Sequence, residues 1–317
     1  MLTLAQHPHL FLGSSPDSRM MGELMLGYGV FAFVVLAIIA GLLVYMKRKY
    51  TVAIGDDSDF REAQDEGKIE IGFALASLVI VVVLTYFSTR TVWKVGVDSE
   101  TALEQPDLLI VGHQWWWEIR YPKAGAVTAN IAHVPKGKRL LVALESADVV
   151  HDWWVAGLGR KMDAIPGETN YFWLEADEVG EFEGACNEFC GMQHAWMRIK
   201  VVAMEPSDFE DWVQAQGREA EAPQSASAIQ GSRLFQEMSC ASCHSIRGTD
   251  AEATIGPDLT HVASRSTLLS GKLPYSKENL RRWLHDPQAE KPGAHMPKFL
   301  LDGQELDHLT EYLGGLK

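Results

Sequence analysis

All four cysteines of the chain lie in two short motifs, and each motif can hold a metal. Cys186 and Cys190 belong to C-N-E-F-C-G-M-Q-H-A-W-M, a segment that also supplies His194 and Met197. Soft sulfur ligands combined with histidine select copper among the common biological metals. A zinc site formed by the two thiols, the imidazole and one further ligand is the alternative. The thioether favours copper over zinc, so the segment predicts a copper site.

The second motif predicts a covalently attached haem. Cys240 and Cys243 belong to C-A-S-C-H, which ends at His244. In C-x-x-C-H the two thiols become thioethers of a c-type haem and the adjacent histidine ligates the iron. The distal ligand is expected downstream, at Met296 in A-H-M-P-K-F, because methionine gives a high haem potential. The neighbouring His295 is the alternative. Copper and haem on one chain predict electron transfer.

A copper site of this kind needs a second histidine from an upstream strand. His151, in D-V-V-H-D-W-W-V, is expected to end a strand and is the first choice. His113 and His133 are alternatives on spacing alone.

Two apolar segments near the N-terminus must anchor these motifs to a membrane. Residues 24–46 carry no charge, and residues 71–93 form a second apolar run. Each is long enough for the roughly 20 residues that cross a bilayer. Residues 47–49 are Lys-Arg-Lys, so the positive-inside rule places the loop between the spans in the cytoplasm. Both chain ends are then expected outside a bacterial inner membrane, on the periplasmic face where c-type haems are attached.

The rest of the chain changes from a β-type pattern to a helical one. Runs rich in β-branched and aromatic residues predict an all-β sandwich or Greek-key barrel; they include residues 108–121, 139–145, 171–174 and 198–204. Helical patterns at 276–286 and 302–313, with one before the haem motif, predict a small all-α domain. The expected parts are an N-terminal segment and hairpin at 1–95, a β domain at 96–217, a polar linker at 218–228 and a haem domain at 229–317.

The charge is concentrated in the β domain. The chain has a net charge of -14, and residues 94–217 contain 20 acidic and 10 basic side chains. Such a surface attracts basic partners, or it only keeps the domain soluble. No basic patch indicates nucleic-acid binding.

Taken together, these motifs resemble subunit II of a haem–copper cytochrome c oxidase, of the caa3-type with a fused C-terminal cytochrome c domain. The resemblance rests on the copper segment and on G-H-Q-W-W-W-E-I-R-Y (112–121), D-V-V-H (148–151) and K-M-D-A-I-P-G-E-T-N (161–170). It implies a multidomain membrane protein with a two-helix transmembrane hairpin, an all-β cupredoxin-like Greek-key domain and an all-α class I cytochrome c domain.

The resemblance implies a binuclear copper centre, CuA, in which two thiolates bridge the metals. The ligands would be Cys186, Cys190, His151, His194, Met197 and the backbone carbonyl of Glu188. The side chain of Glu188 would face a magnesium ion at the junction with subunit I.

Three further residues match family positions. Trp115 corresponds to the aromatic residue through which electrons enter, although core packing is its alternative role. Pro257, in G-P-D-L, corresponds to a proline whose carbonyl orients the proximal imidazole. Glu70, at the start of the second span, resembles the mouth of a proton path, but the family's E-x-x-W here ends in Phe73. A solvated carboxylate at a helix end is the alternative.

The implied function is that of a proton-translocating oxidase subunit. A soluble cytochrome or a quinol-oxidizing complex would reduce haem c, and electrons would continue to CuA and to the haem–copper centre of subunit I. That partner, with further oxidase subunits, would reduce oxygen to water and pump protons. The alternatives are a CuA-containing nitric oxide reductase, a membrane-anchored electron shuttle and a copper-handling protein.

Overall fold

The computed structural model describes residues 13–51 and 67–317. It forms two compact units, one of Arg19–Gly96 and one of Val97–Lys317 together with the chain up to Ser18. The units are considered separately below.

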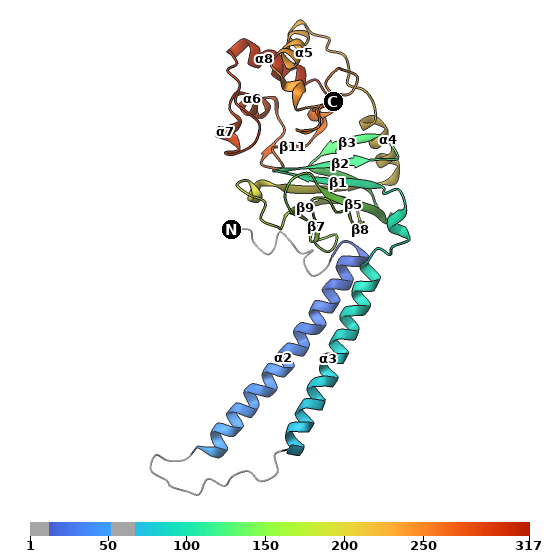
Figure 1. Ribbon diagram of the computed structural model, residues 1–317, viewed down its shortest axis with the longest axis vertical. Coiled ribbons are helices and arrows are strands. Elements are labelled where there is room, and N and C mark those ends of the chain that lie inside the picture. The colour runs from blue at the N-terminus through green and yellow to red at the C-terminus, as the bar shows by residue number, and fades with distance from the viewer. Residues whose placement is uncertain (1–12, 52–66) are drawn as a thin grey trace. The chain divides into compact units, whose positions relative to one another are not determined.

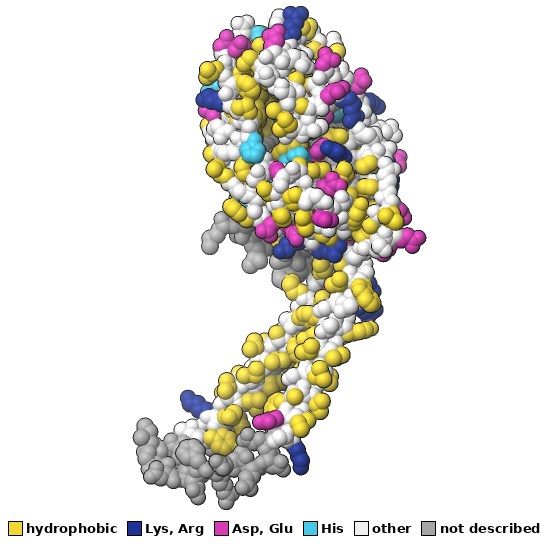
Figure 2. Space-filling model, in the orientation of Figure 1, with side chains coloured by type: hydrophobic (Ala, Val, Ile, Leu, Met, Phe, Trp, Pro, Cys, Tyr) yellow, Lys and Arg dark blue, Asp and Glu magenta, His cyan; other side chains and the backbone are white. Residues whose placement is uncertain are grey.

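The smaller unit is a hairpin of two long helices, α2 (Pro16–Tyr50) and α3 (Gly67–Val95) (Figure 1). Both are long and apolar enough to cross a membrane, and they contain the predicted spans. Within the hairpin, the Tyr28 hydroxyl donates to the backbone oxygen of Leu84 at 2.7 Å and lies 2.6 Å from Ser88 Oγ. Figure 2 shows hydrophobic side chains over most of the visible face of both helices. Helices with this outer surface require lipid around them.

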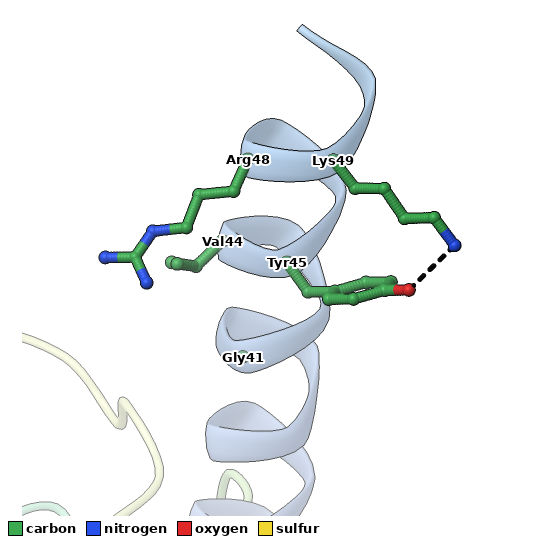
Figure 3. Close-up of a pocket in the computed structure, with 5 residues that line it drawn as sticks. All are labelled: Gly41, Val44, Tyr45, Arg48 and Lys49. Atoms are coloured by element: carbon green, nitrogen blue, oxygen red, sulfur yellow. Dashed lines mark hydrogen bonds between the residues drawn. The ribbon is translucent and has the colours of Figure 1, made fainter.

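The end of α2 is basic, and the first turn of α3 holds Lys68 and Glu70. Lys47, Arg48 and Lys49 occupy the last turn of α2, where cations interact favourably with the helix dipole. Figure 3 shows Arg48 and Lys49 pointing to opposite sides of the helix, with Lys49 Nζ donating to Tyr45 Oη at 2.9 Å. The shallow pocket drawn there is lined by α2 alone. Glu70 is exposed in the first turn of α3.

The larger unit contains a sandwich of two five-stranded sheets, with the orders β3-β2-β1-β5-β8 and β4-β10-β9-β6-β7. Most neighbours are antiparallel, but β1 with β5 and β4 with β10 are parallel. The strands are β1 Leu108–His113, β2 Trp116–Tyr121, β3 Ala126–Ala129, β4 Ile131–Pro135, β5 Leu140–Ser146, β6 His151–Trp154, β7 Met162–Ala164, β8 Asn170–Leu174, β9 Gly180–Cys186 and β10 Arg198–Met204. The predicted all-β cupredoxin-like domain is confirmed.

Two local expectations are wrong. Residues 108–121 form the hairpin of β1 and β2 rather than one run, because the chain reverses at Gln114 and Trp115. His151 begins β6 instead of ending a strand, because residues 147–150 form the connection from β5. The hydrophobic pattern does not reveal the turn at Gln114 and Trp115, because a bulky apolar residue such as Trp115 is read as part of a strand.

The three consecutive tryptophans have three different environments. Trp117 is fully buried in the core, edge-on to Trp153 with ring centroids 5.2 Å apart. Trp116, on the other face of β2, stacks on His113 at 4.2 Å. Trp115 lies in the turn and is also buried. Trp117 and Trp115 therefore both belong to the hydrophobic core of the sandwich, and Trp116 does not.

The C-terminal part is helical. Helix α4 (Pro206–Gln216) packs on β3 and β4. The haem motif follows α5 (Ala226–Glu237), which is capped by Ser225 and begins three residues before the expected boundary. Helix α6 (Lys277–His285), the short α7 (Pro287–Glu290) and α8 (Gly303–Leu313) complete the domain, and α8 begins with the predicted capping box of Asp302 and Glu305. The predicted all-α domain is confirmed.

The half-buried His133 predicts acid sensitivity of the β domain. Its ring stacks on Trp212 of α4 with centroids 4.0 Å apart, and burial lowers its pKa to about 4. The unfolded chain takes up this proton near pH 6.5, so stability is complete above that pH and falls as the pH approaches 4. The loss amounts to about 3 kcal/mol.

We expect His133→Phe, which keeps a ring against Trp212, to lose that slope between pH 6.5 and 4. Chemical unfolding followed by tryptophan fluorescence measures it, with pH 8 as the check that the variant folds. An equally steep decline in the variant would contradict this assignment.

Candidate copper and haem sites

The sandwich brings the upstream histidine to the cysteine segment. Strands β6 and β9 are antiparallel neighbours, with Trp153 opposite Cys186. His151 begins β6 and Cys186 ends β9, so both lie at the same end of the sheet. The loop returns at Met197, whose backbone oxygen accepts from the amide of Cys186 at 3.0 Å. Sheet pairing therefore gathers residues that lie far apart in sequence.

The sulfur and nitrogen atoms of this segment form a compact cluster. A ring nitrogen of His151 and the thiols of Cys186 and Cys190 lie within 4.8 Å of one another. Cys190 Sγ is 3.8 Å from Cys186 Sγ, 3.5 Å from His194 Nδ1 and 3.8 Å from Met197 Sδ. These are the soft ligands that select copper.

A backbone oxygen completes the cluster. The carbonyl of Glu188 lies 3.2 Å from Cys186 Sγ, while the Glu188 side chain is exposed. Four side chains of the cluster are buried, namely His151, Cys186, Cys190 and Met197, while His194 is half-buried.

His151 is oriented for a metal by a neighbouring carboxylate. Its Nε2 lies 2.7 Å from Asp148 Oδ1, and its buried Nδ1 has no hydrogen-bond partner among the described residues. Burial opposes the charged imidazole, but the interactions with Asp148 and Cys186 together outweigh this and raise the pKa of His151. A carboxylate on one ring nitrogen and a metal on the other is the usual arrangement of a ligating histidine. The orphaned Nδ1 thus fits a metal.

The two thiols of the cluster differ in pKa. The hydrogen bond from Cys190 lowers the pKa of Cys186, and the same pairing raises the pKa of Cys190. Metal binding requires thiolates, and one of the pair already favours that form.

The alternative histidines lie in other environments. His113 Nε2 is 3.3 Å from Glu118 Oε2 and its ring stacks on Trp116. His133 stacks on Trp212 of α4. Neither belongs to the cluster with the two thiols. The geometry therefore favours His151.

Gly112 provides a test of the His151 position. A Cβ at Gly112 would lie 2.8 Å from the His151 ring, whereas one at Gly180 would meet nothing closer than 3.7 Å. We expect Gly112→Ala to displace the imidazole and weaken copper binding by about 10- to 100-fold, the usual effect of misorienting a ligand. Gly180→Ala is the matched control and should bind copper normally. Copper titration with the haem content as reference measures both, and equal affinities would contradict the placement of His151.

The haem motif is held against a loop that orients its histidine. Nδ1 of His244 donates to the backbone oxygen of Pro257 at 2.7 Å, which leaves Nε2 as the ligating nitrogen. Burial lowers the pKa of His244 and favours the neutral imidazole that iron binds. A Cβ on Gly256 would lie 2.5 Å from the ring, so only glycine allows this approach. The donor set and its cradle fit a haem, and Pro257 lies where its predicted role requires.

The two candidate distal ligands are placed differently. Met296 is half-buried and packs, with Cys240, on the hydrophobic cluster of the helical domain. His295 is exposed, and its ring lies 5.0 Å from that of Trp115 in the β domain. This arrangement favours Met296.

Sequence reasoning missed the residues that support these sites. Asp148 stands three residues before His151, and a carboxylate at that spacing from a ligating histidine is a signal that the sequence contains. Gln114 Nε2 and Trp115 Nε1 both donate to the Cys190 backbone oxygen, at 2.7 and 2.9 Å. Nothing in the local sequence indicates those contacts, because they join residues about 75 positions apart.

Comparison with known proteins agrees with this reading. Residues 126–204 match the family "Cytochrome C oxidase subunit II, periplasmic domain", and residues 228–317 match the family "Cytochrome c". A cytochrome c oxidase subunit 2 from Alkalihalophilus pseudofirmus is 33% identical over 299 residues, which cover 93% of this chain and 86% of that protein. The corresponding subunit of Bacillus subtilis is 31% identical over 286 residues, covering 83% and 79%.

Among solved structures, the periplasmic domain of subunit II of cytochrome oxidase from Bradyrhizobium japonicum is 32% identical. It covers 36% of this chain and 96% of that one, with a TM-score of 0.34.

The fold and the two sites define a membrane-anchored protein with a cupredoxin domain and a cytochrome c domain. The chain belongs to the cytochrome c oxidase subunit 2 family, in its caa3-type form with a fused cytochrome c domain. It is thus part of a haem–copper terminal oxidase, and its domains imply copper and haem c. The predicted family is confirmed, and it favours the oxidase over the nitric oxide reductase, the shuttle and the copper-handling protein.

Proposed function

We propose that this chain is the subunit through which electrons enter the oxidase, from a donor to haem c, then to a binuclear CuA centre and to subunit I. The observation that carries the proposal is the cluster of two buried thiols, His151, His194 and Met197 beside an exposed loop. Two bridging thiolates share one unpaired electron between two coppers, so the bound centre supplies one-electron transfer with little movement. The protein contributes a buried, preorganised ligand set.

In this proposal Cys186, Cys190, His151 and His194 would hold the copper. Met197 and the Glu188 carbonyl would be its weaker ligands, a role supported by the 3.8 Å and 3.2 Å approaches to the thiols. On the haem side, Cys240 and Cys243 would form the thioethers, and His244 and Met296 would hold the iron.

The surface beside the copper loop is suited to a protein partner. Val149, Val150 and Phe189 line a shallow hollow there, and Phe189 is 77% exposed. Exposed apolar groups around a polar site are typical of protein contacts. We assign this surface to subunit I, with the exposed Glu188 carboxylate available to a magnesium ion at the junction.

The membrane part completes the proposal. The basic end of α2 supports a cytoplasmic loop between the helices, with both chain ends in the periplasm. The first twelve residues lie outside the described part of the chain. Glu70 would then stand at the cytoplasmic end of α3, as a proton path into subunit I requires. The domain boundaries predicted at 95, 217 and 228 are retained as part of the proposal.

Isolation from membranes with partners intact tests the function. We expect the chain to co-purify with a large polytopic subunit, to contain copper and haem c, and to consume oxygen when supplied with a reduced donor. Isolation without such a partner, or uptake of nitric oxide in place of oxygen, would overturn the proposal.

A further inference from the structure

The helical domain covers Trp115. Ser270 Oγ donates to the Trp115 backbone oxygen at 2.9 Å, and the ring of His295 lies 5.0 Å from the indole. Gln193 of the copper loop also donates to the Pro292 backbone oxygen. Trp115 sits in a turn and is only 8% exposed, because it packs on the core of the sandwich on one side and is contacted by the helical domain on the other. The two domains belong to one compact unit, so these contacts are internal to it.

Lys291 of the helical domain is buried in this contact and makes three hydrogen bonds there. It is 4% exposed, and its Nζ donates to the backbone oxygens of Trp115 and Trp196 at 2.8 and 3.2 Å and to Ser270 Oγ at 3.2 Å. An ammonium group has three donors, and all three have acceptors here. Burial, reinforced by Lys272, lowers the pKa of Lys291 to about 7. Burying this group is therefore costly, and the three acceptors offset the cost.

Ser270 reaches the contact from a tight turn. It lies between β11 (Thr267–Leu268) and β12 (Leu273–Pro274), where Leu269 and Ser270 have φ values of +56° and +57°. Non-glycine residues adopt this region at a cost of about 1 kcal/mol or more. The strained turn places the Ser270 hydroxyl beside both Lys291 and Trp115.

The same contact aligns groups between the haem motif and the copper cluster. His295 is adjacent to Met296 in sequence, and its ring contacts Trp115. Trp115 Nε1 donates to the backbone oxygen of Cys190 at 2.9 Å, and the Cys190 thiol belongs to the copper cluster. Met296 is thus connected to Cys190 through the covalent bonds to His295, the ring contact with Trp115 and the hydrogen bond from Trp115 Nε1.

We propose that Lys291 is a positioning residue that locks the haem domain onto the copper domain, and that the lock holds His295 against Trp115 so that the electron passes by this route. The inference rests on the proposed function of the two sites. The step moves one electron: the haem iron is oxidised by one unit, the copper centre is reduced by one, and no bond forms or breaks.

Lys291→Met tests the lock in the full chain within its complex. It keeps the side-chain length and removes the Lys291 donor from the carbonyls of Trp115 and Trp196, of which the Trp115 carbonyl still accepts from Ser270 Oγ. Hydrogen bonds from a charged group are strong enough that the haem-to-copper rate should fall at least about tenfold. Backbone hydrogen exchange at residues 112–117 and 268–273 should become faster, while the reduction potentials of both centres stay unchanged. Lys277→Met, at an exposed lysine paired with Glu311, is the matched control and should alter none of these.

His295 offers a second test that does not depend on a buried residue. Because the side chain is exposed, His295→Ala should fold normally and keep the slow exchange of the docked state. We expect it to slow the haem-to-copper step, and His295→Phe, which restores a ring, to recover the rate.

Particular outcomes would overturn the inference. An unchanged rate in Lys291→Met with faster exchange would show that docking does not control transfer. Unchanged exchange would show that Lys291 is no lock, and a shifted potential would show that it acts on a cofactor. An unchanged rate in His295→Ala would remove His295 from the route. Failure of the parent complex to transfer electrons between haem and copper would instead contradict the proposed function.

Discussion

Replacement of Cys186 by serine is expected to abolish the copper centre while the haem remains. The Cys186 thiol lies 3.8 Å from Cys190 Sγ and 3.2 Å from the Glu188 carbonyl, so it stands at the middle of the cluster. A serine hydroxyl is a hard, protonated ligand and does not bridge copper as a thiolate does. We expect the near-infrared copper band to vanish. Oxygen consumption should fall by more than the roughly 10- to 100-fold that accompanies loss of an outer-shell partner.

The haem spectrum is the internal control of this experiment. Cys240, Cys243 and His244 lie on the helical domain, where Cys240 packs on a separate hydrophobic cluster, so covalent haem should be retained in Cys186→Ser. Reciprocally, Cys240→Ser should impair haem attachment and keep the copper band. An unchanged near-infrared band in Cys186→Ser would refute the assignment of this cluster to copper.

The second large effect concerns the distal haem ligand. Met296→Leu removes the thioether and keeps an apolar side chain of similar size, so packing on the hydrophobic cluster should survive. Methionine ligation raises the potential of a c-type haem. We expect the potential to fall by a substantial part of the roughly 0.8 V range that axial ligands span. The donor would then reduce the haem poorly, and oxygen consumption would fall with it. Redox titration of the haem absorbance measures the change.

His295→Leu is the matched control for Met296. The exposed His295 ring lies against Trp115, so its removal should leave the haem potential where it was, even if transfer to copper slows. A potential that shifts in His295→Leu and not in Met296→Leu would reverse the assignment of the ligand.

Much of the architecture could be predicted because it depends on local patterns. The two apolar runs, the helix capped at Asp302 and the metal motifs are each contained in a few dozen consecutive residues. The hairpin at 108–121 could not be predicted in the same way. Its turn contains Trp115, a bulky residue that usually indicates a strand. The turn is held by contacts to Cys190 and to Ser270, far along the chain.

The site shows the same division between local and distant information. The ligands within the cysteine motifs can be identified from the sequence alone, whereas His151 comes close to them only because β6 pairs with β9. Lys291 looks like an ordinary surface lysine in the segment Q-A-E-K-P-G. Its role depends on two backbone carbonyls, at Trp115 and Trp196, and backbone groups leave no compositional signal. Such contacts follow from the docking of two folded domains and become visible only in three dimensions.

Rapid mixing of the isolated complex with a reduced donor, without oxygen, tests the central claim most directly. The haem c absorbance and the near-infrared copper band are followed in the same sample, and oxygen is then admitted. We predict that haem c is reduced first, that the copper band bleaches as the haem is partly reoxidised, and that oxygen is consumed on its addition. Reduction of copper before the haem, or no oxygen consumption by a complex with both centres reduced, would contradict the account.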